Sequence, residues 1–187
     1  MSMVTAQIVD GNHDLVTELV ELHKIAFPPH MQLREPARYF AEGLLGERHI
    51  NVLLKSREGK VTGYLLGIPH SHVFEELRQW DPDLQDDAER MYLDIIQILP
   101  EQRGNNLGLY LIQKTCEEAE KRKIFKLSMH ARSTTGWARY LLRIFSEIRF
   151  LRRIENWYGS GEPFDYLEAS TTLRVKETPD VTLIPLK

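Results

Sequence analysis

The stretch that decides the fold is residues 91–109, MYLDIIQILPEQRGNNLGL. An apolar run ends at Pro100, a charged turn with a glycine follows, and an amphipathic pattern begins at Leu107. This order predicts a buried strand that leads into a helix through a loop with unpaired backbone N–H groups. Because the start of a helix carries partial positive charge, the loop favours an anion such as a diphosphate.

The composition is that of an ordinary globular chain. The 187 residues are 42% hydrophobic and 27% charged, which predicts one domain and excludes global disorder. The formal net charge of −3 gives no electrostatic case for nucleic acid. The single cysteine, Cys116, excludes an intramolecular disulfide and is expected in the core rather than as a reactive thiol. No apolar run approaches the ~20 residues that span a bilayer, and a leader pattern is absent, so we expect a cytoplasmic protein without a membrane partner.

Periodicity and turn residues predict the other elements and a mixed α/β sheet covered by helices. Strands are expected at 7–9, 50–55, 60–68, 92–99, 124–130, 150–158 and 164–170. Helices are expected at 12–26, with Asn12 as its cap, and at 36–46, 107–122 and 134–148. Residues 69–90 hold seven acidic residues and predict a polar excursion with one short helix. Its charge suits either a solvated face or attraction of a cationic amine.

This order of elements, with PEQRGNNLG at 100–108, resembles the GNAT superfamily of acyl-CoA-dependent N-acetyltransferases over about residues 5–170. The family signature is Arg/Gln-x-x-Gly-x-Gly/Ala after a strand that ends in apolar-x-Pro. The segments 98–100 and 103–108 fit it, except that Asn106 stands where the first signature glycine is expected. Asparagine tolerates positive φ better than other non-glycine residues, so the turn can form, although its side chain crowds a diphosphate.

The resemblance implies one acetyltransferase-like domain over 1–187, with its core at about 5–170 and with 171–187 as a C-terminal tail or edge strand. It implies a mixed, mostly antiparallel central sheet of about 6–7 strands, flanked by about four helices and splayed at the central strands. It also allows a homodimer.

The resemblance further implies acetyl-CoA as co-substrate and no metal. The amides of the turn would hold the CoA pyrophosphate, and the main chain at 96–98 would pair with pantetheine and supply an oxyanion donor. The implied cofactor-binding residues are Ile96, Gln97, Ile98, Arg103, Gly104, Asn105, Asn106, Leu107, Gly108, Leu109 and Ser133. Nucleotide binding by a P-loop is not expected, because the turn lacks the Lys-Ser/Thr ending.

Two residues are candidates for proton transfer. Asp94 shares a strand face with Tyr92 and matches a Glu of some relatives, among them polyamine acetyltransferases; it is either the base, acting through water, or a structural carboxylate. The general acid of the family is usually a tyrosine early in the helix after the next strand. The position of this tyrosine depends on where the alignment with the family starts. Counting forward from the strand 126–130 gives Tyr140, and counting back from Arg149 gives Phe145. A helix about five residues longer than usual reconciles the two counts. We choose Tyr140, with a helix-surface aromatic as the alternative.

Three further patterns have both a structural and a functional interpretation. The segment 156–170 resembles the family's last hairpin, which lines the acceptor side, and its aromatics are expected mostly in packing. His70 and His72 lack a third ligand for a metal site. The arginines after the last helix are expected on a solvated strand edge rather than on a phosphate or an acidic partner. They are Arg149, Arg152 and Arg153.

The predicted function is an N-acetyltransferase that moves an acetyl group from acetyl-CoA to a primary amine of a small molecule or peptide. The amine attacks the thioester directly in a ternary complex. The alternative is a non-catalytic acyl-CoA-binding sensor or interaction module, which Asn106 and the ambiguous tyrosine favour. Asp94 on the strand face speaks against that alternative.

Overall fold

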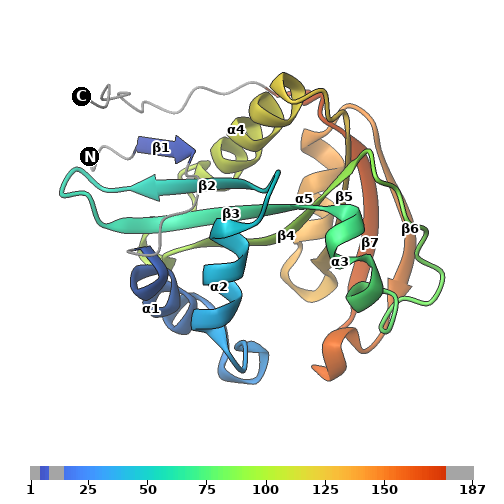
Figure 1. The fold of residues 1–187 in the computed structure, drawn as a ribbon, viewed down its shortest axis with the longest axis horizontal. Coiled ribbons are helices and arrows are strands. Elements are labelled where there is room, and N and C mark those ends of the chain that lie inside the picture. The colour runs from blue at the N-terminus through green and yellow to red at the C-terminus, as the bar shows by residue number, and fades with distance from the viewer. Residues whose placement is uncertain (1–4, 9–14, 176–187) are drawn as a thin grey trace. The chain divides into compact units, whose positions relative to one another are not determined.

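The computed structural model describes residues 5–8 and 15–175. The strands hydrogen-bond in the order β1-β2-β3-β4-β5-β7-β6 (Figure 1). They are β1 (Thr5–Ile8), β2 (Ile50–Lys55), β3 (Val61–Pro69), β4 (Arg90–Ile98), β5 (Lys126–Arg132), β6 (Ile148–Ile154) and β7 (Phe164–Ser170). The helices are α1 (Val16–Ala26), α2 (Pro36–Leu45), α3 (His70–Leu77), α4 (Leu107–Lys121) and α5 (Trp137–Ile144). The predicted cap Asn12 lies outside the described residues.

The strand pairing is mostly antiparallel. β1 pairs with β2, and β7 with both β5 and β6, in antiparallel register. β4 pairs with β5 in parallel, where Arg90–Tyr92 face Lys126–Ser128. The mixed α/β class with a mostly antiparallel sheet and flanking helices is therefore confirmed.

The described chain divides into two compact units, and each is assembled from separate segments. The described residues of the first unit lie at 5–8, 15–66 and 95–115. Those of the second unit lie at 67–94 and 116–175. β4 begins in the second unit and ends in the first.

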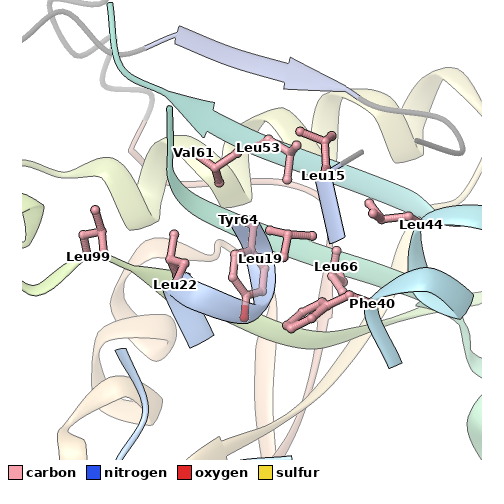
Figure 2. Packing of buried hydrophobic residues seen from close by; sticks show 10 residues of the cluster. All are labelled: Leu15, Leu19, Leu22, Phe40, Leu44, Leu53, Val61, Tyr64, Leu66 and Leu99. Carbon is pink, nitrogen blue, oxygen red and sulfur yellow. The ribbon is translucent and has the colours of Figure 1, made fainter. Parts of the chain in front are cut away.

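In the first unit, α1 and α2 bury their apolar stripes against β2 and β3 (Figure 2). The helical period places Leu15, Leu19 and Leu22 on one side of the first helix, where each is at most 4% exposed. The ring of Phe40 packs edge-on against Tyr64, with centroids 5.3 Å apart. The other buried members of this core are Leu44, Leu53, Val61, Leu66 and Leu99.

Turn residues delimit these elements. α2 has Pro36 in its first turn, where proline is favoured. The β2–β3 turn has Gly59 at φ 82°. Gly46, however, follows α2 with φ −63° instead of a left-handed cap. With the His49 ring where it lies, only glycine fits at this position, because the Cβ of any other residue would lie 2.0 Å from that ring.

In the second unit, the sheet has one apolar and one polar face. α5 buries Ala138, Leu141 and Ile144, and it contacts β5 and β6. The alternating positions of β5 carry Ser128 and His130, which are also buried. These two face Glu168 and Tyr166 of β7 in the strand register. A buried polar sheet face needs polar partners.

The acidic segment 69–90 supplies those partners, and the expectation of a solvated face is wrong for part of it. The short helix is present as α3, but Asp81 is only 2% exposed and accepts a 2.7 Å hydrogen bond from Arg152 Nε. Asp87 pairs with Arg90 and Lys126 at 3.3 Å. Arg152, expected on a solvated edge, therefore points at a buried carboxylate. The partners lie far apart in the chain, so local patterns could not reveal them.

The last helix is shorter than expected. It ends at Ile144, and Phe145 is extended, with φ −83° and ψ 140°. Residues 172–174 explain the end: Arg174 N donates to Ile144 O at 2.7 Å, and Phe145 forms an isolated bridge with Leu173. The remaining apolar residues of the stripe therefore continue into β6. The segment 171–175 has edge-strand character at this bridge, and residues 176–187 lie outside the described part.

Candidate functional site

The turn after β4 has the backbone conformation that the sequence predicts. Gly104 has φ 84° and Asn106 has φ 55°, so both adopt the left-handed region. An added Cβ at Gly104 would meet nothing within 4 Å, which means that φ and not space requires glycine there. Asn106 takes the positive φ expected at the signature position. The exposed segment 103–106 then leads directly into α4.

Side chains of the turn bond to nearby carbonyls, while amides at the start of α4 lack helical partners. Arg103 donates from Nε to Ile98 O at 3.1 Å and from a terminal nitrogen to Ala26 O at 3.2 Å. Asn105 donates to Gln102 O at 3.2 Å. The first intrahelical bond at this end runs from Tyr110 N to Asn106 O. By helix geometry, the three amides before it have no acceptor in the helix. They belong to Leu107, Gly108 and Leu109.

Gln97 lies in the segment 96–98, whose main chain is predicted to pair with pantetheine. Its side chain is buried in the core. Its Oε1 accepts hydrogen bonds from Tyr64 Oη and from His23 Nδ1, the latter at 3.2 Å. His23 Nε2 accepts the Leu33 amide at 3.1 Å, which requires the Nδ1–H tautomer. Burial lowers the pKa of His23 and keeps it neutral. Sequence reasoning missed His23, although a histidine one turn after Leu19 on an apolar stripe was a signal.

Asp94 lies in the second unit and is half-buried on β4. Burial first, and then the charge of Asp94, raises the pKa of the Tyr92 phenol two residues away. Burial, a hydrogen bond to Glu76 and the charge of Asp94 likewise raise the pKa of Tyr158. The structure therefore groups Asp94 with one tyrosine of its own strand and one of the last hairpin.

A buried network lies beside Asp94's neighbour Tyr92. The Tyr92 hydroxyl lies 3.0 Å from His130 Nδ1, and His130 Nε2 lies 3.2 Å from Asp81 Oδ2. The imidazole stacks on Trp157 with ring centroids 3.7 Å apart. Burial lowers the pKa of His130 to about 4, so the ring is neutral, donates to Asp81 and accepts from Tyr92.

The charge of Asp81 is retained within this network. Burial alone would raise its pKa, but His130 and Arg152 hold the pKa of Asp81 below the ordinary value. Sequence reasoning missed the whole network, because Tyr92, His130 and Arg152 come from three different strands and Asp81 from the segment before β4.

Ser133 and Tyr140 flank the start of α5. Ser133 Oγ is buried and has no hydrogen-bond partner among the residues that the structure describes. Tyr140 is half-buried in the first turn of α5, and its ring stacks on Trp137 with centroids 5.2 Å apart. Phe145, the other candidate position, is fully buried beyond the end of the helix.

Within 15–175 and the short β1, the candidate metal ligands do not cluster and Cys116 is buried. No group of three or more His, Cys, Asp or Glu residues in these segments is placed to hold a metal ion. Cys116 is 3% exposed, and burial raises its pKa to about 12, as expected for a core thiol. Among the helices in the same described residues, none is long and apolar enough to cross a membrane.

Comparisons with known proteins agree with the motif. Residues 16–143, more than half of the chain, match the model of the acetyltransferase (GNAT) family. The fold resembles the ribosomal-protein-S18-alanine N-acetyltransferase of Escherichia coli at 15% identity and TM-score 0.65, over 94% of this chain and 99% of that one. It resembles an aminoglycoside 6'-N-acetyltransferase complexed with coenzyme A at 14% identity and TM-score 0.63, over 91% and 99% of the chains.

A spermidine N-acetyltransferase chimera from Vibrio cholerae has 12% identity and TM-score 0.64, over 91% of this chain and 96% of that one. A search of curated protein sequences gave no match. At these identities the solved structures establish the fold, and the family model establishes the membership. The chain belongs to the GNAT acetyltransferase family.

Proposed function

We propose that this protein transfers an acetyl group from acetyl-CoA to a primary amine of a small molecule or peptide, in a ternary complex. The observation that carries the proposal is the turn 103–106 and the start of α4. Gly104 and Asn106 both take positive φ there, and three amides at the helix start lack intrahelical acceptors. A family signature with this backbone suits the diphosphate of CoA.

In this proposal, the turn binds through its main chain. The side chain of Arg103 donates two hydrogen bonds, to Ile98 O and Ala26 O, so its charge lies near the turn. The main chain of Ile96–Ile98 pairs with pantetheine, and one amide there stabilises the oxyanion. Ser133, with its buried Oγ, is assigned to cofactor contact by its motif position.

The chemistry assigns one proton transfer to each of two side chains. The amine nitrogen attacks the thioester carbonyl, and Asp94 accepts the amine proton through a water molecule. As the C–S bond breaks, the CoA thiolate takes a proton from the phenol of Tyr140. The position of Tyr140 in the first turn of α5 supports this role over Phe145, which lies past the helix end.

The test of the chemistry is the variant Tyr140→Phe. Loss of a general acid lowers kcat by about 10²–10⁴-fold, so we expect kcat to fall in that range while the Kd for acetyl-CoA stays unchanged. Free thiol release measures kcat and calorimetry measures Kd. The matched control is Tyr39→Phe, another half-buried tyrosine on a helix, which should leave both values unchanged. An unchanged kcat in Tyr140→Phe would remove this tyrosine from the mechanism.

The second candidate is a non-catalytic acyl-CoA-binding module. The side chain of Asn106, where the family motif has glycine, favours it because the side chain lies at the proposed diphosphate site. Acetyl-CoA binds in both cases. Only an enzyme releases free thiol in the presence of a panel of polyamines, amino acids, aminoglycosides and peptides, so tight binding without turnover across the panel would favour the module.

A further inference from the structure

Two stacked aromatic side chains are exposed on the second unit. Trp80 follows α3, and Tyr158 lies in the turn between β6 and β7. Their ring centroids are 5.4 Å apart with 28° between the planes. They remain 36% and 44% exposed, respectively. Large rings that pack on each other and still face solvent are typical of a binding surface rather than of a core.

The backbone around Tyr158 is specialised for this contact. Tyr158 has φ 53°, a conformation that costs a non-glycine residue roughly 1–2 kcal/mol. Gly159 follows with φ 67°, and an added Cβ there would lie 3.7 Å from the Trp80 ring. That distance is an ordinary van der Waals contact, so the positive φ, and not a lack of space, favours glycine at this position. The packing of Tyr158 against both Trp80 and Trp157 maintains the strained turn.

The charges of two carboxylates act on the same phenol. The Tyr158 hydroxyl donates to Glu76 Oε1 at 2.6 Å, and Glu76 is itself exposed on the last turn of α3. The pKa of Tyr158 is raised by burial, by the bond to Glu76 and by the charge of Asp94, so the negative charges of both carboxylates act on this phenol. Arg78, the nearest cation in the sequence, faces Glu75 at 3.4 Å and the ring of Phe74 instead.

We propose that Trp80, Tyr158 and Glu76 form a subsite for a second cationic group of the acceptor, which makes diamines and polyamines the preferred substrate class. The proposal rests on the proposed acetyltransferase function, with the reacting amine beside Asp94. Aromatic faces attract an ammonium group, and the carboxylate of Glu76 pairs with it. An anionic group would be repelled by both carboxylates, and a purely apolar group would desolvate them without a partner.

The first measurement compares acceptors that differ only in the second charge. The rate of free thiol release with acetyl-CoA is measured for hexylamine, for diaminoalkanes of three to six carbons and for spermidine. We expect kcat/KM to be at least about tenfold higher for the best diamine or polyamine than for hexylamine, with the difference mainly in KM. Equal values for hexylamine and for all of the diamines and spermidine would overturn the subsite.

The second measurement uses variants of the subsite. Glu76→Gln keeps an acceptor for the Tyr158 hydroxyl but removes the charge, and Trp80→Leu removes the ring. Both should lower kcat/KM for the best diamine about tenfold and leave the value for hexylamine unchanged. The matched controls are Glu75→Gln, the adjacent exposed carboxylate, and Phe125→Leu, an aromatic that is 57% exposed elsewhere on the same unit. A melting temperature that falls in a subsite variant but not in its matched control would show that the substitution destabilises the fold.

Calorimetry of spermidine binding to the acetyl-CoA-loaded protein separates this inference from the proposed function. Binding that weakens about tenfold in Glu76→Gln supports the subsite even if no amine is turned over, in which case only the proposed function fails. Turnover of amines with no effect of either variant on binding overturns the subsite and leaves the function standing. Turnover of peptides, without binding of any diamine, also overturns it.

Discussion

Asn106 combines a glycine conformation with a side chain. Asn106 adopts a φ of 55°, and the family turn therefore forms here without glycine. Asparagine is among the few residues that reach this region at low cost, whereas a β-branched residue is strained there.

The first prediction at this scale is that Asn106→Val destabilises the protein by about 1–2 kcal/mol, the usual cost of a left-handed conformation. Asn106→Gly should be within about 0.5 kcal/mol of the parent, and it should bind acetyl-CoA more tightly because the side chain is gone. Urea unfolding measures stability and calorimetry measures binding. A valine variant as stable as the parent would contradict the assigned role of φ.

Buried imidazoles predict a pH dependence of stability. Burial lowers the pKa of His23, His70 and His130, the last to about 4. The unfolded chain titrates near 6.5, so below that pH it binds more protons than the folded state does. The stabilising contribution is therefore complete above about pH 6.5 and is lost as pH falls toward 4. At about 1.4 kcal/mol per pKa unit, His130 alone contributes on the order of 3 kcal/mol.

Urea unfolding at pH 7, 6 and 5 measures this dependence, and the free energy of unfolding should fall at each step. His72→Gln is the control, because His72 is exposed on α3 and its removal should leave the slope unchanged. A free energy that stays level from pH 7 to 5 would be inconsistent with neutral buried imidazoles.

At the scale of elements, segment 69–90 is attached to the polar sheet face mainly through Asp81. Asp81→Asn removes the charge that Arg152 and His130 face. Loss of one partner of a fully buried pair costs about 3–5 kcal/mol, and we expect about 2–4 kcal/mol because Arg152 is 25% exposed. The exposed neighbour is the control: Asp83→Asn should change stability by less than about 0.5 kcal/mol.

Limited proteolysis gives a second readout for the same pair of variants. Asp81→Asn should be cleaved within 69–90 faster than the parent, and Asp83→Asn at the parent rate. Equal cleavage of all three proteins would mean that Asp81 does not hold this segment on the sheet.

The elements that could be predicted from the sequence are those whose signals are local. The apolar run of β4, the glycine-bearing turn and the period of α4 lie within 91–121, and all were predicted nearly to the residue. The end of α5 could not be predicted, because Phe145 and Ile148 continue the helical stripe in phase. Hydrogen bonds from residues 172–174 decide that end, and they come from a distant segment.

In the candidate site, too, the parts with local sequence signals could be predicted and the parts that depend on distant contacts could not. The main-chain turn follows from a contiguous motif, and its positive φ values were expected. The network of Asp81, His130 and Arg152 depends on contacts across 49 and 71 residues of the chain. An acidic run has the same local pattern whether it meets solvent or distant arginines, so only the folded chain distinguishes these cases.

At the scale of the whole molecule, family membership predicts that acetyl-CoA stabilises the folded protein. A ligand at 100 times its Kd contributes about 2.7 kcal/mol, which for a chain of this size raises the melting temperature by about 5–10 °C. Asn105→Asp adds a negative charge to the turn and should abolish most of this shift through repulsion of the diphosphate. Asn156→Asp, in the exposed β6–β7 turn, should retain it. If Asn105→Asp keeps the full rise in melting temperature, the proposed diphosphate site at the turn 103–106 would be contradicted.

The prediction of a single acetyltransferase domain over 1–187 remains a prediction. The described residues form two units, and segments of each alternate along the chain. Dimerisation is likewise still an expectation from the resemblance.

This alternation has a consequence for synthesis on the ribosome. When residues 1–69 have emerged, α1, α2 and the paired strands β2 and β3 are present, but Gln97 is not. His23 and Tyr64 then lack the acceptor that they share in the finished fold. The apolar core of this unit also lacks Ile95 and Leu99 at that stage, and incompletely buried apolar surface makes a partly folded chain prone to aggregation. During synthesis, the first third of the chain therefore stays incomplete until β4 has been made.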